Sequence, residues 1–92
     1  MLDRTNPNVT ERVAYLVHRL FAKRSINRTV GADDDLGESG LSSLDIVNLM
    51  LAVEAEFDLK IAEQDMTPTN FRTVARIETL VRALLHNDRN HS

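Results

Sequence analysis

Several residue types are absent or scarce in this chain of 92 residues, and each absence excludes a class of chemistry. There is no cysteine, so disulfide bonds, cysteine-ligated zinc and a cysteine nucleophile are excluded. Tryptophan is missing and aromatic residues make up only 4%, so aliphatic residues and methionine must build the core. Three glycines and two prolines are too few for a collagen-like or low-complexity chain. No apolar run approaches the roughly 20 residues that span a bilayer, and the polar N-terminus lacks the apolar segment of a signal peptide.

The composition that remains suits one small folded domain. Hydrophobic residues make up 42% of the chain, and domains of roughly 50–200 residues are common. We therefore expect residues 1–92 to form a single domain, with an ordered core over about residues 8–86 and a polar tail at each end. With no signal peptide or membrane span in the sequence, a cytoplasmic location is the default expectation.

The formal net charge of −3 conceals an uneven distribution along the chain. Residues 1–30 carry a net +4, residues 31–65 carry −9 and residues 66–92 carry +2. An acidic centre between basic ends fits a partner with a basic surface, or equally the neutralisation of one helix by its neighbours. The basic residues are sparse and lack interleaved aromatics, and the isoelectric point is near 5.5, so nucleic-acid binding is not indicated.

Apolar residues recur at helical spacing in three segments, which predicts helices over residues 8–25 and 43–57 and from residue 74 to about 86. Thr67-Pro68 indicates the start of one short helical turn. Between the first two helices lies a loop over residues 26–42 that holds all three glycines. No segment alternates as a strand does. The expected fold is an all-α bundle of three main helices plus one short helix, with a long loop between the first and second main helices.

The predicted helix over residues 43–57 is apolar over about half its circumference, so we expect its apolar side to be well buried. That side comprises Leu44, Ile46, Val47, Met50, Leu51, Val53 and Phe57. The opposite, narrower arc comprises Asp45, Asn48, Ala52 and Glu56. By this assignment the polar arc is the exposed one.

The junction between the long loop and this helix carries the chemistry that the sequence offers. Ser42-Ser43-Leu44-Asp45 has the form of a capping box, a serine followed three residues later by an acid. With Ser42 as the cap, Ser43 is the first helical residue, and its side chain points outward beside backbone N–H groups that favour an attached phosphate. Gly40 removes side-chain bulk nearby. From the residues alone, ordinary capping remains the simpler explanation of both serines.

The order of residues around this junction resembles that of the acyl carrier protein family. The resemblance rests on Asp35-Leu36-Gly37 and on the run from Leu41-Ser42-Ser43-Leu44-Asp45 to Glu56-Phe57. The family has an Asp-Ser-Leu attachment motif at the start of its second helix, then a Val–acid–Leu step and an acidic stretch that closes on Phe. Here Ser42 replaces the Asp, and Asn48 replaces the acid of the second motif. With these changes the chain is similar in particular to bacterial aminoacyl carrier proteins.

This resemblance implies a carrier rather than an enzyme. Ser43 would bear a 4′-phosphopantetheine arm, which a phosphopantetheinyl transferase takes from coenzyme A, with Ser42 as the flanking helix cap. The thiol of the arm would hold cargo as a thioester. Similarity to aminoacyl carriers implies an amino acid loaded by a ligase related to the catalytic core of seryl-tRNA synthetase, then passed to a downstream acceptor enzyme. The chain would act as a monomer, and the residues expected to meet its partners are Asp45, Asn48, Glu56, Glu38 and Leu44.

Two other functions stay open beside the aminoacyl carrier. One is a carrier of fatty-acyl or polyketide-type chains, and the other is an unmodified helical module that docks a basic partner. A calcium-binding EF-hand starting at Asp33 fails, because its sixth position is Glu38 rather than Gly and its twelfth is Leu44 rather than Glu. We therefore predict no EF-hand and assign no metal ligand, while weak divalent binding by Asp33-Asp34-Asp35 stays open.

Overall fold

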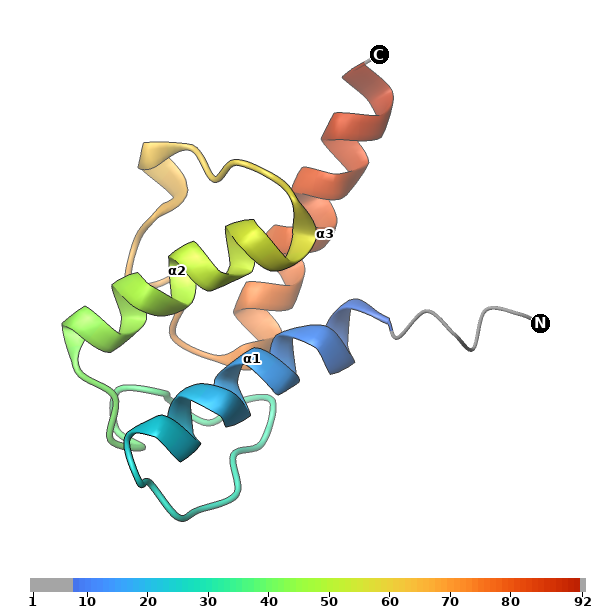
Figure 1. Cartoon of the computed structure of the whole chain (residues 1–92). Coiled ribbons are helices and arrows are strands. Elements are labelled where there is room, and N and C mark those ends of the chain that lie inside the picture. The colour runs from blue at the N-terminus through green and yellow to red at the C-terminus, as the bar shows by residue number, and fades with distance from the viewer. Residues whose placement is uncertain (1–7, 92) are drawn as a thin grey trace.

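The computed structural model describes residues 8–91 and contains no β-strand over that range (Figure 1). Its helices are α1 (Val9–Lys23), α2 (Ser43–Phe57), the short 3-10 helix η2 (Glu63–Asp65) and α3 (Val74–His91). α1 packs against both α2 and α3, and a long loop joins α1 to α2 (Figure 1). The predicted all-α bundle with one short helix is confirmed. Within the described range, no helix is both long enough and apolar enough to cross a membrane.

Side-chain caps fix where the helices begin. Asn8 Oδ1 accepts a hydrogen bond from the Glu11 N–H at 2.8 Å, and α1 starts directly after Asn8. Thr73 caps the start of α3 in the same way, because its Oγ1 accepts a hydrogen bond from the Arg76 N–H at 3.0 Å. α1 ends two residues before its predicted end, since Ser25 takes a left-handed backbone with a φ of 58°.

Two further boundaries differ from the sequence prediction. The short helix forms at Glu63–Asp65 rather than after Thr67, where the Thr67 Oγ1 accepts from the Asn70 N–H and closes only a single turn. α3 continues to His91, past the predicted end near residue 86, because the residues that follow include neither proline nor glycine. The polarity of this segment is therefore not enough to end the helix.

The core lies between the three main helices, and the long loop is tied to it. The buried apolar residues are Val13, Leu16, Val17, Phe21, Leu36, Leu41, Leu49, Met50, Val53, Phe57, Ile61, Phe71, Val74, Ile77 and Val81. Leu36 of the loop is fully buried, and its N–H donates to the Arg72 carbonyl at 2.8 Å. The Ala75 N–H donates to the Ala32 carbonyl at 3.0 Å. These two bonds hold the loop that leads into α2 against the start of α3.

α2 is oriented differently from the sequence prediction. Three residues of its predicted core side, Leu44, Val47 and Leu51, are 68%, 46% and 54% exposed. Asp45, which we expected to face outward, is only 5% exposed. The buried face of α2 consists of Asp45, Leu49, Met50, Val53 and Phe57, most of which recur every four residues. The rest of the bundle covers only this side, so part of a broadly apolar helix remains exposed.

Candidate functional site

The long loop reaches the start of α2 through one tight turn at Gly40. Gly40 has a φ of +127°, a backbone conformation that L side chains rarely adopt. A Cβ at this position would lie 3.0 Å from the Ile26 Cδ1 atom, and the next residue, Leu41, is buried in the core. Glycine is therefore required here both for conformation and for space.

The predicted capping box is present at the start of α2. The Ser42 Oγ accepts from the Asp45 N–H at 3.1 Å, and the Asp45 Oδ2 accepts from the Ser42 N–H at 2.9 Å. Arg24, just past the end of α1, adds an ion pair, with its Nε 3.2 Å from the same Asp45 oxygen. Ser43 is consequently the first helical residue, as predicted.

These contacts keep Asp45 ionised. The hydrogen bond from the Ser42 backbone N–H contributes most to lowering the pKa of this carboxyl, and the Ser42 hydroxyl and Arg24 lower it further, while burial opposes them. The carboxylate thus compensates the positive end of α2 from within the fold. The side chain of Asp45 is buried and bonded within the chain, which does not favour a direct contact with a partner, and its predicted docking role stays a prediction.

Ser43 occupies the first position of α2 with its side chain exposed. Backbone N–H groups at a helix start have no partner within the helix, and the positive end of the helix dipole favours an anion there. A cavity of about 230 Å³ opens beside this serine. Its lining comprises Asp35, Gly37, Leu41, Ser42, Ser43, Ile46, Pro68, Phe71 and Arg72. The hydroxyl thus has solvent access, space beside it and an anion-favouring backbone, which suit a phosphate ester.

The other predicted partner residues lie along α2 and in the loop before it. Leu44 and Asn48 are exposed one helical turn apart, near Ser43. Glu38 is exposed in the loop. Glu56 lies at the far end of α2, where its Oε2 is 2.8 Å from the Arg12 Nε. Leu44 and Asn48 therefore lie near the start of α2 and Glu56 does not, and the docking roles of all these residues stay predictions.

The consecutive aspartates of the loop form turns. The Asp34 Oδ2 accepts from the Gly31 N–H at 2.8 Å, and the Asp35 Oδ1 accepts from the Glu38 N–H at 2.9 Å. In the part of the chain that the structure describes, no three His, Asp or Glu side chains converge as metal ligands would. These carboxylates therefore have a conformational role in the loop.

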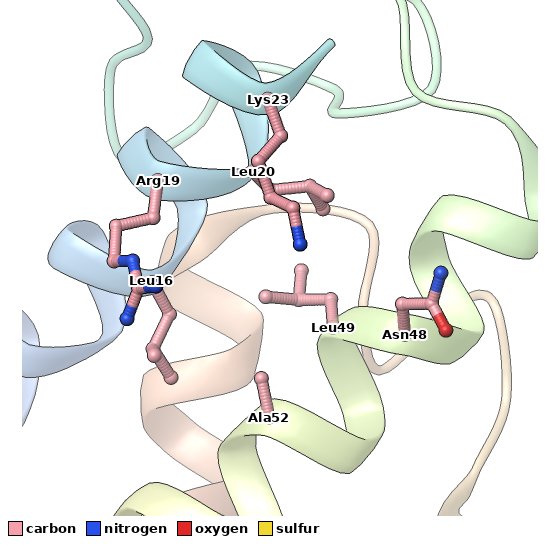
Figure 2. A pocket seen from close by; sticks show the side chains of 7 residues that line it. All are labelled: Leu16, Arg19, Leu20, Lys23, Asn48, Leu49 and Ala52. Atoms are coloured by element: carbon pink, nitrogen blue, oxygen red, sulfur yellow. The ribbon is translucent and has the colours of Figure 1, made fainter.

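A cleft that the sequence did not predict lies between α1 and α2 (Figure 2), and we call it the α1–α2 cleft. Its volume is about 180 Å³. Its lining comprises Leu16, Arg19, Leu20, Lys23, Asn48, Leu49 and Ala52. The sequence holds one signal for it, because α1 has basic residues but no acidic residue from Arg12 to its end. Which helix those basic residues face could not be inferred from that signal.

The bundle and the exposed serine at the start of α2 define a class of protein. The phosphopantetheine attachment site family matches residues 19–81, a range that includes α2 and the loop before it. The chain belongs to this family of carrier proteins, whose cofactor is covalently attached 4′-phosphopantetheine. The sequence-based resemblance to carrier proteins is thereby confirmed.

The chain is similar in particular to aminoacyl carrier proteins. Aminoacyl carrier protein 1 of Bradyrhizobium diazoefficiens is 40% identical over 76 residues, which cover 83% of this chain and 84% of the relative. Aminoacyl carrier protein 2 of the same organism is 39% identical over 80 residues, which cover 87% and 90%.

Two crystal structures of Bradyrhizobium japonicum glycine:[carrier protein] ligase contain a chain with the same fold at 38% identity. In the complex with glycylated carrier protein, the TM-score is 0.68 and the match covers 79% of this chain and 99% of that chain. In the complex with the cognate carrier protein and an analogue of glycyl adenylate, the TM-score is 0.70, with coverages of 83% and 99%. At 38% identity, these carrier chains resemble the present chain in family as well as in fold.

Proposed function

We propose that the 4′-phosphopantetheine of this carrier is attached to Ser43 and that its cargo is an amino acid. The observation that carries the proposal is the position of Ser43, exposed at the start of α2 beside a cavity of about 230 Å³. Ser42 is engaged in the capping box, because its hydroxyl accepts from the Asp45 N–H. Two aminoacyl carrier relatives and a glycylated carrier of the same fold support the cargo class, and glycine is the first amino acid to test.

In this proposal the chain presents the arm and has no catalytic residue of its own. Ser43 holds the arm through a phosphodiester, whose charge the N–H groups at the start of α2 offset. The arm supplies a thiol on which the cargo is held as a thioester. The chain contains no cysteine that could take the cargo from that thiol. The capping box keeps the attachment point rigid while the arm reaches into partner enzymes.

Three kinds of partner follow from this function. A phosphopantetheinyl transferase attaches the arm, a ligase related to the seryl-tRNA synthetase core loads the amino acid, and an acceptor enzyme receives it. The loading ligase is supported by the similar structures, in which glycine:[carrier protein] ligase is complexed with a carrier protein. We further propose that the chain meets these enzymes as a monomer of one domain, and its cytoplasmic location stays a prediction.

Arm attachment is tested by intact mass spectrometry after incubation with coenzyme A and a phosphopantetheinyl transferase. We expect one arm on the wild type and on Ser42→Asp, which keeps a capping oxygen, and none on Ser43→Ala. If the circular dichroism spectrum of Ser43→Ala equals that of the wild type, the loss of arm attachment does not come from unfolding. An arm on Ser43→Ala, or no arm on the wild type with several transferases, contradicts the proposal.

The cargo is tested on the protein that already bears the arm. With ATP, glycine and the Bradyrhizobium japonicum glycine:[carrier protein] ligase, we expect a mass gain of one glycyl group that hydroxylamine removes, as it does from a thioester. Mass spectrometry of the arm isolated from native cells identifies the cargo directly. A fatty-acyl or polyketide-type chain on the isolated arm would contradict the proposed amino acid cargo. The proposed attachment at Ser43 would not be affected.

A further inference from the structure

The exposed side of α2 forms an apolar surface beside Ser43. Leu44, Val47 and Leu51 follow one another at spacings of three and four residues, so they lie along one side of the helix. Asn48 is exposed among them. We call these four residues the α2 stripe. Three adjoining large aliphatic side chains exceed the scattered apolar exposure of an ordinary surface and indicate a docking surface.

The acidic residues of α2 are each hydrogen-bonded or ion-paired within the chain, and none of them belongs to the α2 stripe. Asp45 accepts from the Ser42 N–H and pairs with Arg24. The Glu54 Oε2 accepts from the Ile61 N–H at 2.7 Å. The Glu56 carboxylate pairs with an arginine of α1 at 2.8 Å. Arginines within the fold therefore pair with two of the three carboxylates of α2, Asp45 and Glu56, on which an acidic docking face would depend.

The charge next to the α2 stripe is positive and comes from α1. Arg19 and Lys23 line the α1–α2 cleft, whose other wall includes Asn48 of the stripe (Figure 2). In Figure 2 the Lys23 side chain extends from α1 toward the cleft above Leu49. Both cations are exposed, and neither forms a salt bridge with another described residue. The rim of this cleft is thus cationic, and its interior is mostly aliphatic.

We propose that the α2 stripe and the α1–α2 cleft together dock an apolar, carboxylate-bearing segment of the loading ligase. Apolar side chains of that segment cover the aliphatic residues of the stripe, and a carboxylate enters the cleft between Arg19 and Lys23, where the Asn48 amide adds a donor. This charge complementarity is the reverse of the basic partner that the sequence suggested. The identity of the partner as a ligase rests on the proposed function, whereas the polarity of the surface rests on the structure alone.

Loading kinetics of the arm-bearing chain with the Bradyrhizobium japonicum ligase test this polarity. We expect Arg19→Glu/Lys23→Glu to raise the KM about tenfold or more at low salt with little change in kcat, because these charges act on association. The matched control Lys60→Glu/Arg76→Glu makes the same change in net charge at exposed positions outside the cleft, and it should load like the wild type. A wild-type KM in the cleft variant, or an equal rise in the control, overturns the proposal.

Binding of two peptides tests the proposed docking surface separately from the proposed function. Two short helical peptides share one leucine stripe, flanked by glutamates in the first and by lysines in the second. At low salt we expect the glutamate peptide to shift the amide NMR signals of Arg19, Lys23, Asn48 and Leu51 far more than the lysine peptide does. Equal shifts with both peptides, or none with either, overturn the proposed polarity. A wild-type chain that the ligase does not load refutes glycine loading by that enzyme, while the peptides still decide the surface.

Discussion

α1 and α2 each contain 15 residues and each bury four apolar side chains, yet they differ in what else they bury and expose. α1 buries Val13, Leu16, Val17 and Phe21 and turns its charged residues outward. α2 buries the carboxylate of Asp45 and leaves three large aliphatic side chains exposed. Only α1 follows the usual pattern of an amphipathic helix on a core.

Core packing accounts for the buried residues of both helices, but it does not account for the exposed aliphatic side of α2. Full burial of an aliphatic side chain contributes about 1.5–3 kcal/mol, so packing alone would favour turning the apolar side of α2 inward. The four apolar residues that α2 buries, together with the capping box and the anchored loop at its start, set its orientation and leave the opposite aliphatic side exposed. We interpret α1 as a structural helix that also supplies cations, and α2 as the helix that docks.

The sharpest test of this comparison is a pair of leucines on opposite sides of α2. Leu49 is 1% exposed, so Leu49→Ala should lower the free energy of unfolding by about 2–5 kcal/mol. Leu51 is 54% exposed, and Leu51→Ala should change it by only about 0.5 kcal/mol. Urea unfolding followed by circular dichroism measures both. Equal losses of unfolding free energy in the two variants would show that Leu49 and Leu51 do not lie on the buried and exposed sides of α2, respectively.

A substitution in the loop between α1 and α2 should cause an intermediate loss of stability. Gly40→Ala places a Cβ 3.0 Å from Ile26, the third residue after α1, at a φ of +127°. We expect it to lower the free energy of unfolding by about 1–3 kcal/mol, measured by urea unfolding. Gly31→Ala is the control, because a Cβ there meets only Asp34, at 3.4 Å, and should cost little. If both variants are equally stable, the turn at Gly40 does not constrain the start of α2.

Replacing the buried carboxylate should give the smallest change in stability, and the size of this change should depend on pH. The pKa of Asp45 is lower in the folded chain, so its ionised form stabilises the fold at neutral pH, and this contribution is lost as the pH falls through the folded pKa. Asp45→Asn should therefore be less stable than the wild type at pH 7. The gap should narrow below about pH 4, near the ordinary pKa of aspartate. Urea unfolding across this pH range measures the gap, and a gap that stays constant or widens in acid contradicts this account.

Local signals predicted the start of each main helix and the neighbourhood of Ser43. The bonds of Ser42 with Asp45 and of Asn8 with Glu11 span three residues, so the sequence contains everything that forms them. The short helix at Glu63–Asp65 was misplaced, because no side chain caps it. Its position depends on how the chain between α2 and α3 packs rather than on a local motif.

The sequence by itself determined that the chain forms three main helices, that Ser43 begins the second, and that the chain resembles carrier proteins. Only the tertiary structure decided which side of α2 is buried and that α1 contributes the cations beside it. The physical reason is that helical periodicity groups residues on one side of a helix without saying which side its neighbours cover. That choice depends on contacts between distant residues, such as Arg12 with Glu56, which lie 44 positions apart.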